Sequence, residues 1–384
     1  PMSTPQQEQH YRAFVHIHYF FRYSCLFLKW SRTEIMSTFR QKYQRQFTGK
    51  RHRWILGMVS LLWLIWGGML PLPAAQAAQA EHIVLVVLEG IKSSAIQNGA
   101  APHIAQFAQE GVASWSAQSI TPPLTVSAMA SLITGLPVEK HRITADWEHY
   151  DFARSFMRSP TVFDYMDLAG GRDTGVFLMD ERLYQLIRPE IYVDSQVCGY
   201  TKPQCTPETV SAYIKDFLVK VTSGEGHGFR LFGVPNLLVT HFPTAARIGQ
   251  KYGWDSPKYS AAVTAIDNAV DQIKKNYQEI GVLDRTMFIV TGLNSGPIHP
   301  SITKGKEAKA ADLDPTVPWI AWGANVKHQH PISQRVTLLD TAATIMYALG
   351  LDTHTEWDSQ AITGIFQSIP KRQTTENELE KIYR

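Results

Sequence analysis

Two polar residues stand where the first apolar elements of the sequence end or begin. Glu89 and Gly90 close the apolar run HIVLVVLEG, which is typical of a buried strand, and Thr125 lies in PPLTVSAMASLITG, which predicts the start of a helix. A carboxylate can bind a cation, and a hydroxyl can attack an electrophilic centre. A threonine at a helix start can also simply cap the backbone, so Thr125 alone specifies no chemistry.

The segment from His82 to Gly135 resembles the opening of the alkaline phosphatase superfamily, in its type I phosphodiesterase/nucleotide pyrophosphatase branch. In that family the strand ends in Asp-Gly, which supplies a metal-binding carboxylate, and a nucleophilic Thr or Ser lies ten residues before a glycine. Here Glu89-Gly90 replaces Asp-Gly, and Thr125 lies ten residues before Gly135. The resemblance implies two zinc-like ions that polarise a phosphoryl group and activate Thr125 beside a helix N-terminus.

The resemblance continues through most of the chain, over roughly residues 82 to 365. Five later segments carry it: APHIAQFAQEGV, ITADWE, GQKYGWDSPKYSAAVTAIDNAV, PWIAWGANVK and LLDTAATIMYALGL. Together they fix the register well enough to compare single positions with the family pattern.

The register places unsuitable residues at the family's remaining functional positions. The expected metal ligands fall at Ala246, Gln250, Leu293, Asn294 and Lys306, and the phosphate-holding asparagine falls at Ala128. Alanine and leucine have no donor atom, an amide is a poor zinc ligand, and an ammonium repels a cation. Glu89 is the one carboxylate left at a ligand position, so we expect no metal cofactor.

Four other residues could rebuild a metal site. His241 and His299 lie near strand ends, and Asp312 and Asp314 lie in the loop before Pro318. Each has a simpler explanation: a partly buried strand-end histidine, a loop histidine and two solvated loop carboxylates. A single histidine so placed is more often structural than a ligand.

These observations favour an exported, non-catalytic family member with a binding or scaffold role. Its ligand would be an unknown small anion, held by the helix N-terminus and Lys306, or a protein partner. The alternative is an active phosphodiesterase or phosphatase that uses Thr125 as its nucleophile with a rebuilt metal site. Metal-free acid-base chemistry through Glu89 and a histidine is a third hypothesis, which no spacing supports.

Charge is distributed unevenly along the chain. Residues 1 to 80 carry ten basic and two acidic side chains, a net charge of +8, which leaves 27 basic and 32 acidic side chains, a net charge of −5, for residues 81 to 384. The excess of basic residues therefore lies in residues 1 to 80, which we call the leader. The rest of the sequence does not indicate a nucleic-acid surface.

The leader resembles a secretory signal. Basic residues precede the uncharged run WILGMVSLLWLIWGGML and the small-residue segment PLPAAQAAQA, where cleavage would follow Ala77 or Ala80. An uncleaved anchor formed by residues 54–70 is the alternative, because the run nearly reaches the length that spans a bilayer. Either reading predicts a periplasmic or extracellular domain, and membrane contact only through this segment.

The predicted organisation has four parts. Residues 1–35 are a doubtful upstream segment before Met36, residues 36–80 are the signal or anchor, residues 81–368 form one domain, and residues 369–384 are a charged tail. Within the exported part, Cys198 and Cys205 are the two cysteines, and their spacing across CGYTKPQC suggests a local disulfide.

The alternation of strand-like and helical segments predicts an α/β fold, a mostly parallel central sheet with helices on both faces. The predicted strands are His82 to Leu88, Thr174 to Leu178, Asn236 to His241, Thr286 to Thr291 and Pro318 to Trp322. The clearest helix follows the Ser256-Pro257 cap and stops at Gly281, and another spans about Thr337 to Leu349.

Overall fold

The computed structural model describes residues 78–149, 151, 157–169, 173–187, 193–197, 205–223, 233–299 and 309–367. The chain divides into two units, Pro1–Ala74 and Ala75–Arg384, and every described residue belongs to the second unit. The predicted signal or anchor and the charged tail lie outside the described residues. Of the helices that the structure describes, none has the length and apolar character needed to cross a membrane.

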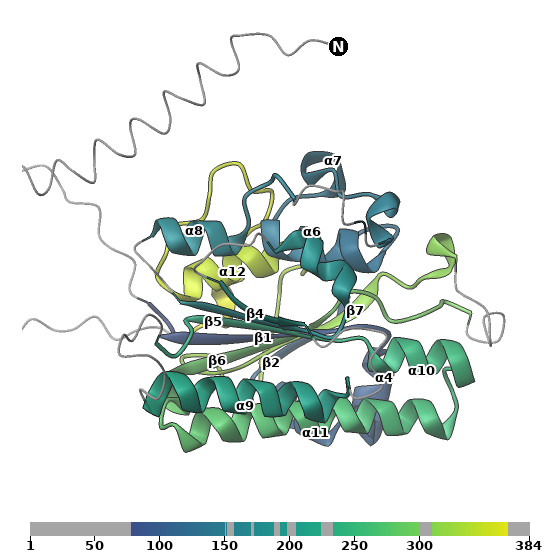
Figure 1. Ribbon diagram of the computed structural model, residues 1–384, viewed down its shortest axis with the longest axis horizontal. Helices are drawn as coiled ribbons and strands as arrows, with labels where there is room; N and C mark the ends of the chain where they lie inside the picture. The colour runs from purple at the N-terminus through teal and green to yellow at the C-terminus, as the bar shows by residue number, and fades with distance from the viewer. Residues whose placement is uncertain are drawn as a thin grey trace, which may run out of the picture. The chain divides into compact units, whose positions relative to one another are not determined.

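Among the described residues, an eight-stranded sheet, ordered β4-β3-β5-β1-β6-β7-β2-β8, forms the centre of the second unit (Figure 1). Its strands are β1 (His82–Leu88), β2 (Val112–Gln118), β3 (Thr174–Leu178), β4 (Val193–Val197), β5 (Leu237–Phe242), β6 (Thr286–Gly292), β7 (Thr316–Gly323) and β8 (His330–Pro331). Strand β7 runs antiparallel to both of its neighbours, and the other pairs are parallel. The predicted fold class is confirmed.

Helices cover both faces of the sheet, as Figure 1 shows. One face carries α6 (Thr125–Thr134), α8 (Val162–Leu168) and α12 (Asp340–Ala348), whose buried residues form one apolar cluster with Ile83, Leu85 and Val87 of β1. The other carries α5 (Pro102–Glu110), α9 (Pro207–Ser223) and α11 (Pro257–Glu279), whose buried residues form a second cluster with Val84, Val86 and Leu88 of β1. Because helices bury both faces, β1 is a continuous apolar run and not an alternating one.

The predicted strands occur within two residues of their predicted ends, but β2, β4 and β8 were not expected. Strand β2 has the sequence VASWSAQ and is only partly buried along its length. It therefore lacks the apolar run that marks the central strands. Its pairing with β7 is what makes it a strand, and such tertiary pairing is not visible in local sequence.

The long helix α11 agrees with its prediction. The Ser256 side chain accepts a hydrogen bond from the Tyr259 amide at 3.2 Å, and Gly281 beyond the helix adopts a φ of +73°. Helix α12 begins at Asp340, later than predicted. The Asp340 carboxylate accepts hydrogen bonds from the backbone and side chain of Thr337, both at 2.8 Å, so residues 337–339 form a turn that precedes the helix.

The carboxyl ends of four strands meet at one edge of the sheet. Leu88 at the end of β1 pairs with Phe242 of β5 and with Gly292 of β6, and Leu178 at the end of β3 pairs with His241. Residues that follow these strands are therefore brought together, although they are up to 205 positions apart in the sequence between Glu89 and Asn294. This edge is where ligands bind in sheets of this kind.

Candidate functional site

The backbone at Glu89 and Gly90 is held between the ends of β5 and β6. The Glu89 amide donates to the Phe242 carbonyl at 3.1 Å, and the Gly90 amide donates to the Asn294 carbonyl at 2.9 Å. Gly90 has a φ of +73°, and a Cβ built there would lie 2.6 Å from the Cα of Ala246. Glycine is required because the neighbouring segment, which begins α10 (Thr244–Tyr252), packs directly on this turn.

Thr125 is the first residue of α6, and its hydroxyl faces Glu89. The Thr125 Oγ1 donates a hydrogen bond to the Glu89 Oε1 at 2.6 Å, and both side chains are buried. Leu124 is the N-cap, and no side chain caps the helix from that position. The alternative reading of Thr125 as a plain cap is therefore wrong: its side chain points to a carboxylate and not to the backbone.

His241, near the end of β5, lies on the other side of the Glu89 carboxylate. Its side chain is completely buried, and its Nε2 lies 3.4 Å from the Glu89 Oε2. Neither imidazole nitrogen has a hydrogen-bond partner that meets normal geometry. Burial opposes ionisation of Glu89, but the contact and charge of His241, with a smaller effect of Arg182, hold the pKa of Glu89 below its usual value.

Glu148 places a second carboxylate directly on the N-terminus of α6. It ends the 3₁₀ helix η2 (Ala145–Glu148), and its Oε1 accepts hydrogen bonds from the Val126 amide at 2.7 Å and the Ser127 amide at 3.4 Å. These amides are among the donors that a helix leaves unpaired in its first turn. Burial, opposed by the charge of Arg182, raises the pKa of Glu148 to about 7.

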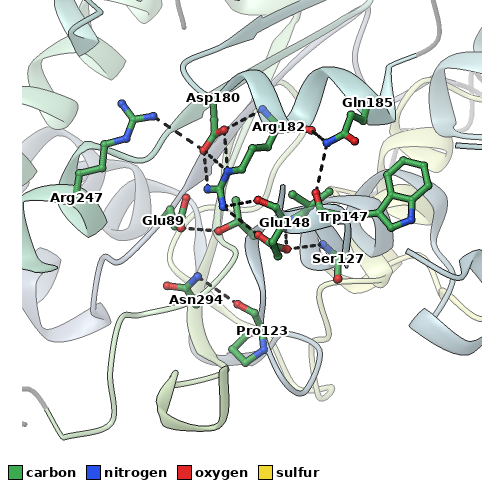
Figure 2. Close-up of polar contacts among 12 residues, drawn as sticks. Glu89, Pro123, Ser127, Trp147, Glu148, Asp180, Arg182, Gln185, Arg247 and Asn294 are labelled. Carbon is green, nitrogen blue, oxygen red and sulfur yellow. Dashed lines mark hydrogen bonds and ion pairs between the residues drawn. The ribbon is translucent and has the colours of Figure 1, made fainter. Parts of the chain in front are cut away.

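Arg182 connects Glu148 to a third carboxylate, that of Asp180 (Figure 2). Its Nη1 lies 3.1 Å from the Glu148 Oε2, and its Nε and Nη2 contact the two Asp180 oxygens at 3.0 and 2.7 Å. Arg182 belongs to the 3₁₀ helix η3 (Glu181–Leu186), just beyond the end of β3. Burial disfavours the charge of Asp180, but the hydrogen bonds and charge of Arg182 outweigh it and lower the pKa of Asp180.

Arg247 lies at the outer side of this network. It donates from Nη2 to the Met179 carbonyl at 2.7 Å, and the same atom lies 4.0 Å from the Asp180 Oδ2. A cavity of about 540 Å³ is lined by Arg247 together with Glu89, Thr125, Glu148, Asp180 and Arg182. Its other walls include Gln250, Trp254 and Asn294. The site therefore combines two guanidinium groups with several carboxylates, and most of its charges are paired with one another.

Four of the expected ligand positions lie at or behind this cavity, and none presents a strong metal donor. Ala246 packs on Gly90 and lines the wall, as does Gln250. Leu293 is fully buried in the core, and the Asn294 amide donates to the Pro123 carbonyl at 3.3 Å. The loss of metal ligands at these positions stays a prediction.

The remaining candidates do not join the site. Ala128 is buried within α6, and Lys306 lies outside the described residues. His299, Asp312 and Asp314 are described but do not line the cavity. They fit the simpler explanations given above: Asp314, for example, accepts a hydrogen bond from the Thr316 amide at 2.8 Å within its own loop.

The structure describes one of the two cysteines of the predicted disulfide. Cys205 takes part in a disulfide bond. Cys198 lies outside the described residues, so the pairing of these two cysteines stays a prediction.

Sequence reasoning missed Glu148, Asp180, Arg182 and Arg247. A usable signal existed for two of them, because Asp180 and Arg182 follow β3 directly, at the same strand edge as Glu89. Glu148 ends the segment ITADWE, which carried part of the family resemblance, but nothing in its spacing shows that it reaches α6. Arg247 follows Ala246 directly, but no motif in the sequence marks it as a site residue.

Comparison with known proteins identifies the class. The family model described as "Type I phosphodiesterase / nucleotide pyrophosphatase" matches residues 83–292, more than half of the chain, so the chain belongs to this family. Its fold is that of the alkaline phosphatase superfamily, as its structural neighbours show. Among curated proteins, no significant sequence match was found.

Three solved structures illustrate the likeness. The 2-O GAG sulfatase BT1596 superposes with a TM-score of 0.56 at 11% identity, covering 76% of each chain. Mouse ectonucleotide pyrophosphatase/phosphodiesterase 5, solved as an inactive variant with AMP, gives 0.54 at 12% identity, covering 71% of this chain and 96% of its own. The lipoteichoic acid synthase LtaP from Listeria monocytogenes gives 0.53 at 15% identity, covering 75% of each chain. At these identities the likeness shows the fold alone.

The residues present do not fit the two divalent ions that the family implies. No group of three or more His, Cys, Asp or Glu side chains suited to a metal ion occurs in the part of the chain that the structure describes. At the cavity wall, the Ala246 side chain has no donor atom and the Gln250 amide is a poor zinc ligand. Arg182 already pairs with the Glu148 and Asp180 carboxylates, which therefore have a partner other than a metal ion.

Proposed function

We propose that this chain is an exported, non-catalytic member of the type I phosphodiesterase family, and that its pocket serves binding. One observation carries the proposal: the Glu148 carboxylate occupies the α6 amides and pairs with Arg182. In a metal-dependent member, cations and a phosphoryl group would meet in front of this helix. In this chain the Arg182 guanidinium supplies a positive charge in place of the metal ions, and the Glu148 carboxylate supplies a negative charge in place of the phosphoryl group.

The state of Thr125 supports the same proposal. A threonine hydroxyl needs a base or a bound metal ion to become a nucleophile at neutral pH. The Thr125 hydroxyl donates to Glu89, a carboxylate whose pKa is lowered and which is therefore a weak base. The hydrogen bond orients the hydroxyl but supplies little driving force for losing its proton.

The proposed location rests on the leader sequence. A basic segment followed by an apolar run and small residues is typical of a secretory signal, and residues 54–70 would anchor the chain if cleavage fails. The domain would then be periplasmic or extracellular. A small anion or a protein partner is the proposed ligand, and the net charge of −5 after residue 80 argues against nucleic acid.

Metal content and hydrolysis test this proposal together. The full-length protein is loaded with zinc or manganese, desalted and analysed for metal by plasma mass spectrometry, and then assayed with an aryl phosphodiester. A folded protein that retains no metal and shows no hydrolysis above the Thr125→Ala variant supports the proposal. Retained metal, together with hydrolysis that Thr125→Ala abolishes, contradicts it.

One observation favours a second candidate, an active enzyme with a rebuilt site. The Glu89 Oε2 and the His241 Nε2 are 3.4 Å apart, and two ligands of a tetrahedral zinc ion are also separated by about 3.4 Å. Neither atom has a hydrogen-bond partner. If one ion per chain is retained, a His241→Ala variant that loses it would identify this candidate as correct.

A further inference from the structure

The residues that directly precede β1 are bound to the end of a helix. The Gln79 and Ala80 amides donate hydrogen bonds to the Ala348 carbonyl at 2.7 and 2.9 Å. Ala348 is the last residue of α12, and the last carbonyls of a helix have no partner within the helix itself. Residues 79–81, which we call the docked segment, therefore complete the C-terminal end of α12.

Two asparagines and an arginine hold the docked segment from other parts of the fold. The Asn325 side-chain amide donates to the Gln79 carbonyl at 2.6 Å, and the Asn236 side-chain amide donates to the Glu81 carbonyl at 2.9 Å. The Glu81 amide donates to the Arg285 carbonyl at 3.0 Å, and the Glu81 carboxylate lies 2.9 Å from the Arg285 guanidinium. The backbone of this segment is therefore fixed by contacts with several remote parts of the chain.

Burial changes abruptly at the start of the docked segment. Gln79 is 6% exposed and Ala80 is 5% exposed, and Ala80 belongs to the same apolar cluster as Ile83 of β1. Ala78, one residue earlier, is exposed. The packed part of the domain therefore begins at Gln79, before the first strand.

The leader contains two A-x-A spacings, and they differ in their relation to this boundary. The first, Ala75 to Ala77, precedes the docked segment, and the bond after it joins Ala77 to the exposed Ala78. The second, Ala78 to Ala80, includes buried, hydrogen-bonded backbone, which resists proteolysis. Cleavage after Ala80 would also remove both amides that donate to the buried Ala348 carbonyl, and a buried acceptor without a donor destabilises a fold.

We propose that cleavage of the leader follows Ala77, so that the exported protein begins at Ala78 and keeps the docked segment. A signal peptidase would hydrolyse the bond between these two alanines with one water molecule, leaving a carboxylate on Ala77 and an ammonium group on Ala78. The new ammonium group belongs to an exposed residue, where water solvates its charge. The inference rests on the export that is part of the proposed function, and it is independent of the chemistry of the pocket.

The first residue of the exported chain tests the proposal. The full-length protein is produced with its leader in a bacterial host, and the exported chain is analysed by intact mass and N-terminal sequencing. A chain that begins at Ala78 is expected. An exported chain that begins at Glu81, or that keeps residues 54–70, overturns this inference alone. A chain that stays unprocessed in the cytoplasm overturns the proposed export as well, so the location of the protein distinguishes the two failures.

Matched substitutions separate the two possible cleavage positions. Ala75→Leu removes a small residue from the first A-x-A spacing alone, and Ala78→Leu removes one from the second spacing alone. Ala75→Leu is expected to abolish the product that begins at residue 78. Ala78→Leu, at an exposed residue, is expected to leave the position of cleavage unchanged. The reverse result overturns the proposal.

The melting temperature of the exported protein shows whether the docked segment is retained. Ala80→Asp places a carboxylate at a buried position and is expected to lower the melting temperature by at least about 4 °C. Ala78→Asp adds the same charge at an exposed position and is expected to change it by less than about 1 °C.

A milder substitution keeps this test decisive if aspartate prevents folding. Ala80→Gly removes the buried methyl group alone and is expected to lower the melting temperature by about 2 °C. A melting temperature that neither substitution at Ala80 changes overturns the proposal, because residue 80 would then contribute nothing to the exported domain.

Discussion

Substitution of Glu148 by glutamine should change how the stability of the protein depends on pH. Burial raises the pKa of Glu148 from 4.5 to about 7 in the folded protein. Between these values the folded state binds the proton more tightly than the unfolded state does. The free energy of unfolding therefore falls as the pH rises through this window, and the loss is complete above pH 7.

The size of the effect follows from the shift. A change of about 2.5 pKa units corresponds to about 3 kcal/mol, since each unit is worth about 1.4 kcal/mol. The Glu148 side chain is 15% exposed, so solvent screening removes little of this. Glutamine keeps an oxygen that accepts from the Val126 amide, but it does not ionise, so the Glu148→Gln variant should lack this part of the pH dependence.

Urea denaturation at several pH values between 4.5 and 8 measures the effect. Relative to Glu148→Gln, the wild-type protein is expected to lose about 3 kcal/mol of unfolding free energy across this range. Glu356→Gln, which removes an exposed carboxyl, is the control and should follow the wild type. If wild type and Glu148→Gln respond to pH alike, the α6 amides and Arg182 stabilise the ionised carboxylate as well as water does, and the reasoning from burial is refuted.

Three further changes test the turn at Gly90 and two buried polar residues elsewhere in the fold. Gly90→Ala should destabilise the protein by about 2 kcal/mol or more, because a Cβ at a φ of +73° would clash with the backbone of Ala246. An unchanged melting temperature would refute this conformation of the turn. Asp267→Ala should lower the free energy of unfolding by about 1 to 3 kcal/mol, because the buried carboxylate accepts a hydrogen bond from the Ile104 amide at 2.8 Å. Urea denaturation measures the loss, and a smaller loss than that from replacing an exposed aspartate would contradict this role. His141 is buried, which lowers its pKa to about 4, so wild-type stability should fall by about 3 kcal/mol as the pH drops from 6.5 to 4, and His141→Asn should remove that fall.

The sequence by itself determined the fold class and the positions of the central strands. The run His82 to Leu88 is apolar at every position, and such runs belong to strands buried between two helical layers. The cap at Ser256 and the spacing of apolar residues in α11 are equally local, so they could be predicted without the fold. The family resemblance added the pair of Glu89 and Thr125, which the structure brings to hydrogen-bonding distance.

The tertiary structure alone decided how the charges of the site are arranged. Glu148 reaches α6 from a separate 3₁₀ helix, and Arg182 arrives from beyond β3, so their meeting depends on the packing of three elements. The burial that shifts the pKa of Glu148 is likewise a property of the assembled domain. Periodicity and spacing report on single elements, whereas the pairing of charges requires the distances between elements that are remote in the sequence.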